Sequence, residues 1–140
     1  MNFAHSILAL FFLLSASVYA QTTSGPHLEI KSPVDFGTLK QGEKQRIEVI
    51  YQNTGTTNLV VTNVVSSSSF IKVTNEAIEI EPGKYGKFQI EITHWYFYNE
   101  NNPPSGDQPT SKTLMIMTNE EENSSHMIKV VGKMAPPTDY

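Results

Sequence analysis

The stretch GKFQIEITH, residues 86–94, is the cleanest case of a two-residue period in this chain. Its apolar residues Phe88, Ile90 and Ile92 alternate with polar residues, so an extended strand would have one apolar and one polar face. The same alternation recurs at residues 45–52, 111–118 and 127–133, and shorter strand candidates lie at 28–31, 58–65, 70–73 and 77–81. No segment after residue 20 has a convincing helical periodicity. These patterns predict a domain built from β-strands.

Turn-forming residues lie between the apolar segments. Pro82-Gly83 fits the centre of a type II turn, whose third residue needs the positive φ that glycine adopts without strain. Asn53 and Gly55 suit a hairpin bend, and the polar segment 119–125 suits another turn. Strands at this spacing predict an all-β, immunoglobulin-like antiparallel β-sandwich of about seven or eight strands.

Residues 1–20 have the pattern of a secretory signal peptide. The apolar run ILALFFLLSASV begins at Ile7, and the small residues Val18 and Ala20 stand where a signal peptidase cleaves. The preceding MNFAHS contains no Lys or Arg, so an uncleaved N-terminal anchor is the alternative. No second apolar span follows, so we expect no transmembrane segment after cleavage. The expected location is across the inner membrane, in the periplasm or at the cell surface.

The rest of the chain is long enough for one domain. We expect residues 21–26 to be a short N-terminal extension, residues 27–134 to form the sandwich, and residues 135–140 to be a frayed tail. Pro136 and Pro137 support the last boundary, because proline cannot donate to a strand ladder.

Charge and composition exclude two classes of function. The chain has 10 Lys and Arg against 14 Asp and Glu, a formal net charge of −4, and no Cys. No basic stripe is available to neutralise phosphates, so we do not expect nucleic-acid binding. Without Cys the chain has no thiol nucleophile and no thiolate metal ligand.

Four consecutive aromatic residues, Trp95, Tyr96, Phe97 and Tyr98, follow the strand that ends near His94. If the alternation continued, Trp95 and Phe97 would face outward and form a stacking platform for a glycan or an anchor for a protein partner. Alternatively, a bulge at His94 resets the alternation and packs Trp95 or Phe97 under the loop, as long loops often do.

Metal binding and catalysis have weaker candidates. Met115, Met117, His126 and Met127 carry thioether and imidazole groups that suit Cu(I), although methionine also fills apolar gaps in a sheet. No Ser lies in a nucleophile elbow, and His27, His94 and His126 form no close pair along the chain. We therefore expect no enzyme activity and no cofactor.

The segment VDFGTLKQGEKQRIEVIYQNTGTTNLVVTNV, residues 34–64, resembles a family of secreted bacterial immunoglobulin-like proteins of unknown function, abundant in Bacteroidetes. That family is similar to the Hydin and major-sperm-protein sandwiches. The matching residues occur in order along the chain: Phe36-Gly37, Gly42-Glu43, Asn53-Thr54-Gly55, Pro82-Gly83 with Gly86, and Ser111-Lys112-Thr113. The resemblance implies the fold and, for most members, no known activity.

This chain departs from the family at two positions. It has SSSSF at residues 66–70 in place of a Cys-Gly-Cys motif, and a long aromatic segment where relatives have a short loop before Ser111. We expect an exported, non-enzymatic module that binds a protein partner through an edge strand or the 94–109 loop. The alternative is a small-ligand binder, for a glycan at the aromatic loop or for copper through Met and His.

Overall fold

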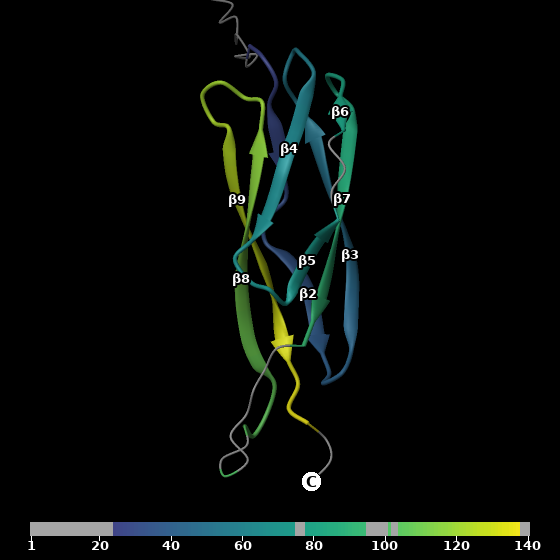
Figure 1. Ribbon diagram of the computed structural model, residues 1–140, viewed down its shortest axis with the longest axis vertical. Helices are drawn as coiled ribbons and strands as arrows, with labels where there is room; N and C mark the ends of the chain where they lie inside the picture. The colour runs from purple at the N-terminus through teal and green to yellow at the C-terminus, as the bar shows by residue number, and fades with distance from the viewer. Residues whose placement is uncertain (1–23, 75–77, 95–100, 102–103, 138–140) are drawn as a thin grey trace, which may run out of the picture.

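The computed structural model describes residues 24–74, 78–94, 101 and 104–137, and they form two packed β-sheets (Figure 1). One sheet has the strand order β1-β3-β7-β5, with β1 at Leu28–Ile30, β3 at Lys44–Asn53, β7 at Tyr85–Thr93 and β5 at Ile71–Thr74. The other has the order β2-β9-β8-β4-β6, with β2 at Val34–Leu39, β9 at Ser125–Met134, β8 at Gln108–Thr118, β4 at Leu59–Ser66 and β6 at Glu79–Ile80. No helix in the described part of the chain is long and apolar enough to cross a membrane.

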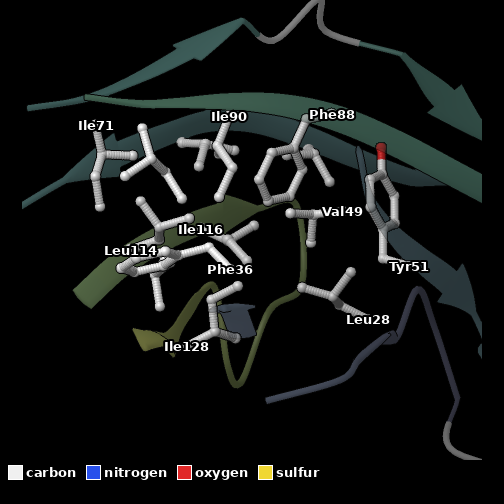
Figure 2. Packing of buried hydrophobic residues seen from close by; sticks show 14 of the residues in the cluster. Leu28, Phe36, Val49, Tyr51, Ile71, Phe88, Ile90, Leu114, Ile116 and Ile128 are labelled. Atoms are coloured by element: carbon white, nitrogen blue, oxygen red, sulfur yellow. The ribbon is translucent and has the colours of Figure 1, made fainter. Parts of the chain in front are cut away.

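Side chains in residues 86–94 alternate between the two faces of β7 as predicted. Phe88 is 3% exposed, and Ile90 and Ile92 are fully buried. All three belong to the core, and Figure 2 shows Phe88 and Ile90 facing apolar side chains of the opposite sheet, including Leu114 and Ile116. The all-β immunoglobulin-like sandwich is therefore confirmed.

Two details of the sandwich differ from the expectation. The described residues form nine strands, and the additional one is β2. It runs parallel to β9, with Val34 opposite Val130 and Leu39 opposite Met134, so the sandwich is not antiparallel throughout. The chain changes sheet at residues 31–33, between β1 and β2, and β2 therefore joins the edge of β9 instead of pairing back on β1.

Two aromatic rings each lie over a glycine on the neighbouring strand. A Cβ at Gly86 would lie 2.5 Å from the ring of Tyr51, and a Cβ at Gly132 would lie 2.5 Å from the ring of Phe36. Any larger residue at either glycine would push the ring out of its place. The hydroxyl of Tyr51 is buried without a hydrogen-bond partner among the described residues, and burial raises the pKa of this group.

The turn predicted at Pro82-Gly83 is present, but the hairpin predicted at Asn53 and Gly55 is wrong, because the flanking strands β3 and β4 lie in different sheets. Gly83 has φ +78°, and the Lys84 amide donates to Glu81 O at 3.1 Å, which is the geometry of a type II turn. Gly55 is required for space, because a Cβ there would lie 2.1 Å from Gly25 O. Asn53 is fully buried, and its side-chain amide donates to Thr57 O and Ile80 O.

Candidate functional site

Three regions of the described chain are candidates for a functional site. They are the open sheet edges, a methionine-rich sheet face, and a buried carboxylate that contacts two histidines. Each brings together residues from distant parts of the chain.

The open edges are β1 and β5 in one sheet, and β2 and β6 in the other. β1 has three residues and β6 has two, which is short for pairing with a partner strand. β2 is interrupted by a register shift between Asp35 and Thr38, where Gly37 has φ +74°. β5 has four residues in unbroken antiparallel register with β7. Of the four strands at the sheet edges, β5 is the longest whose register is unbroken.

The backbone of β5 alternates between its two sides. The Thr93 amide donates to Phe70 O at 2.9 Å, which makes Phe70 and Thr93 a hydrogen-bonded pair. The pairs Lys72–Glu91 and Thr74–Gln89 follow in the same register, so their backbone groups face β7. The N–H and C=O groups of Val73 consequently point away from β7, toward the open edge.

The outer face of this sheet is basic beside β5. Lys44 Nζ lies 3.4 Å from Glu91 Oε1, and Arg46 Nε lies 3.0 Å from Glu91 Oε2. The hydrogen bond from Arg46 is the largest cause that lowers the pKa of Glu91. Lys72 lies opposite Glu91 on the other side. Three basic side chains therefore surround one carboxylate, leaving a positive surface next to the open edge.

The outer face of the second sheet is apolar where β4, β8 and β9 run together. Met115 lies opposite Val65 on β4 and opposite Met127 on β9, and Met117 is two residues further along β8. The exposed fractions are 38% for Met115, 39% for Met117, 75% for Met127 and 43% for Val65. We call Met115, Met117 and Met127 the methionine face.

His126 does not belong to the methionine face. It lies opposite Ile116, a fully buried residue, so its side chain is on the inner side of the sheet. Of the four residues considered for copper, the three methionines therefore lie on the outer face of the sheet and His126 lies on the inner face. Among the described residues, no group of three or more His, Asp or Glu is arranged to hold a metal ion.

The third region is built around Glu120, which is only 6% exposed. His27 Nδ1 lies 3.0 Å from Glu120 Oε1, and His126 Nε2 lies 2.5 Å from Oε2. Thr118 Oγ1 donates to Oε2 at 2.7 Å, and the Leu28 amide donates to Oε1 at 3.2 Å. We call His27, Thr118, Glu120 and His126 the Glu120 cluster. It ties the start of β1 to the β8–β9 turn.

Several groups act on the ionisation of Glu120. Burial by itself would raise the pKa of its carboxyl group, because a buried charge loses hydration. Hydrogen bonds from Thr118, His126 and the Leu28 amide outweigh burial and lower the pKa below its ordinary value. The carboxylate is therefore held ionised.

Sequence reasoning missed the Glu120 cluster. The local pattern placed Glu120 in the turn at residues 119–125 and showed no close pair among His27, His94 and His126. In the structure Glu121 and Glu122 are exposed, but Glu120 is buried. One signal was available: Thr118 and Glu120 share a parity with the buried residues Leu114 and Ile116.

The aromatic residues Trp95, Tyr96, Phe97 and Tyr98 lie outside the described residues. His94, the residue before them, contacts the C-terminal segment: its Nε2 lies 3.0 Å from Ala135 O. A glycan or protein site at the 94–109 loop stays a prediction.

Solved structures similar to this chain share its fold. A protein of unknown function from Porphyromonas gingivalis W83 has a TM-score of 0.61 and 17% identity, over 85% of this chain and 51% of its own length. The ASH/PapD-like domain 7 of human CEP192 has a TM-score of 0.53 and 12% identity, over 100% of this chain and 99% of that domain. The E. coli chaperone DraB has a TM-score of 0.50 and 12% identity, over 84% of this chain and 59% of DraB. These likenesses support the immunoglobulin-like sandwich fold.

The chain spans about half the length of the Porphyromonas gingivalis protein. No curated protein matches the chain. A family model described as "Protein of unknown function (DUF1573)" matches residues 28–134, which include all nine described strands. The chain belongs to the DUF1573 family.

Proposed function

We propose that this chain is an exported, non-enzymatic interaction module that binds an extended segment of a partner protein along the open edge of β5. The observation that carries the proposal is the regular register of β5 with β7, which leaves the Val73 N–H and C=O directed outward. Backbone groups in this arrangement pair readily with an added strand. The PapD-like fold of the similar structures supports a role in protein interaction.

The surface beside β5 selects the chemistry of the partner. Lys72 projects on the outer face, and Lys44 and Arg46 both contact the single carboxylate of Glu91. A strand added to β5 would place its outward side chains next to Lys72. We therefore expect the bound segment to carry an acidic residue there, with apolar residues on its other face. The aromatic residues of the 94–109 loop would supply a second contact.

Photo-crosslinking in the cells that naturally produce the protein tests this proposal. A photo-reactive amino acid replaces Thr74, whose side chain is exposed on β5. This substitution leaves Lys72 intact. We expect one protein to be captured, with the crosslink in an extended, acidic segment. The same probe in place of Glu29 on β1 is the positional control.

Two substitutions of Val73 separate the backbone contribution from packing. Val73→Pro removes the outward N–H and lowers the crosslinking yield about tenfold, because a lost hydrogen bond and a clashing ring together exceed about 1.4 kcal/mol. Val73→Ala loses comparable packing but keeps the N–H, so we expect it to retain capture. Equal yields from Val73→Pro and Val73→Ala, or equal capture from position 29, would overturn the proposal.

A further inference from the structure

The outer face of the second sheet carries a feature that strand addition at β5 does not use. Natural sheets normally cover an outward face with polar or charged residues, as the first sheet does with Lys44, Arg46 and Glu91. On the second sheet, three of the exposed outward side chains are thioethers from two adjacent strands.

The register places two of these methionines directly opposite each other. The Thr118 amide donates to Ser124 O at 2.9 Å, which makes Thr118 and Ser124 a hydrogen-bonded pair. Antiparallel pairs alternate, so Met115 and Met127 form a non-hydrogen-bonded pair. Side chains in such pairs approach most closely, with Cβ atoms about 4.5–5.5 Å apart.

Met117 completes the set. It lies two residues from Met115 on the same face and diagonally across from Met127, within reach of a long side chain at about 7–8 Å. Each methionine has three rotatable bonds and a polarizable sulfur, so the three can turn toward one point above the sheet.

We propose that Met115, Met117 and Met127 bind a soft monovalent metal ion, Cu(I), through three thioether sulfur atoms. Thioethers are soft ligands that select Cu(I) over harder divalent ions, and they carry no proton to displace. The chain contains no Cys, so methionines supply its only sulfur ligands. Val65 lies against Met115 on the far side and offers an apolar wall without a competing ligand.

The His126 imidazole is not part of this site. It is held on the inner side of the sheet by Glu120 Oε2. The expected coordination is therefore sulfur alone, which distinguishes this site from the mixed methionine and histidine set that the sequence suggested.

Silver provides a redox-stable probe for the geometry. Ag(I) is titrated into the full chain while the ε-methyl resonances of methionine are followed by NMR. We expect the resonances of Met115, Met117 and Met127 to shift together and saturate at one equivalent. Met134, which is 1% exposed in the core, is the internal control and should not move. Absent shifts, or three resonances that saturate independently, would overturn the proposal.

Affinity is measured with Cu(I) in competition with a chromophoric chelator. We expect Met115→Leu to weaken Cu(I) binding by at least about tenfold, because it removes the central ligand, while its similar volume preserves the melting temperature. Val65→Ala removes apolar area from the same face but no ligand, so it should retain Cu(I) affinity. Equal affinity in Met115→Leu and wild type, or Zn(II) binding as tightly as Cu(I), would exclude the thioether site.

Discussion

Glu91 and Glu120 each hydrogen-bond to two basic side chains, but in different surroundings. Glu91 is paired with Lys44 and Arg46, whose side chains are 58% and 73% exposed. Glu120 is paired with His27 and His126, and its own side chain is only 5% exposed. Water and salt screen the first arrangement, so it contributes little to stability. Breaking the second leaves buried polar groups without partners, which is costly.

The largest expected effect comes from removing the buried charge. Glu120→Gln replaces an acceptor oxygen with an amide donor that faces N–H or O–H groups of the cluster. We expect it to lower the free energy of unfolding by about 2–3 kcal/mol, measured by urea denaturation.

Glu121→Gln is the matched control for that substitution. It makes the same change of net charge on the exposed neighbouring residue, and it should change stability by less than about 0.5 kcal/mol. An equal effect from the two variants would show that net charge, and not the Glu120 cluster, is responsible.

The effect of Glu120→Gln on stability should depend on pH. The folded pKa of Glu120 is lowered from the ordinary 4.5, so its stabilising effect is fully present above that value. It is lost as the pH falls through the lower, folded pKa. We expect the stability difference between wild type and Glu120→Gln to shrink as the pH falls below about 4.5. A difference that does not shrink in that range would contradict this assignment.

The smallest effect is expected at the exposed carboxylate. Glu91→Gln should destabilise the protein less than Glu120→Gln does, because Lys44 and Arg46 remain solvated without it. The remaining effect should disappear in about 1 M salt, where the Debye length is about 3 Å. The effect of Glu120→Gln should persist there, since the cluster is shielded from ions. Equal salt sensitivity of the two variants would contradict the distinction between a solvent-screened carboxylate at Glu91 and a buried one at Glu120.

Local patterns predicted much of the fold. The alternation of Phe88, Ile90 and Ile92 fixed which side chains enter the core, and Pro82-Gly83 gave the turn before that strand. The candidate sites were less predictable, because each depends on pairing between segments far apart in the chain. Nothing near Glu120 in the sequence indicates that His27 donates to it from the other end of the domain.

Local patterns predicted eight of the nine described strands, their inward faces and the all-β sandwich, since a period of two needs only neighbouring residues. Tertiary structure alone decided that β5 is a regular open edge, that β2 runs parallel to β9, that Met115 lies opposite Met127, and that His27 reaches Glu120. These features follow from register and sheet order, which are set by contacts between distant segments and leave no local signature.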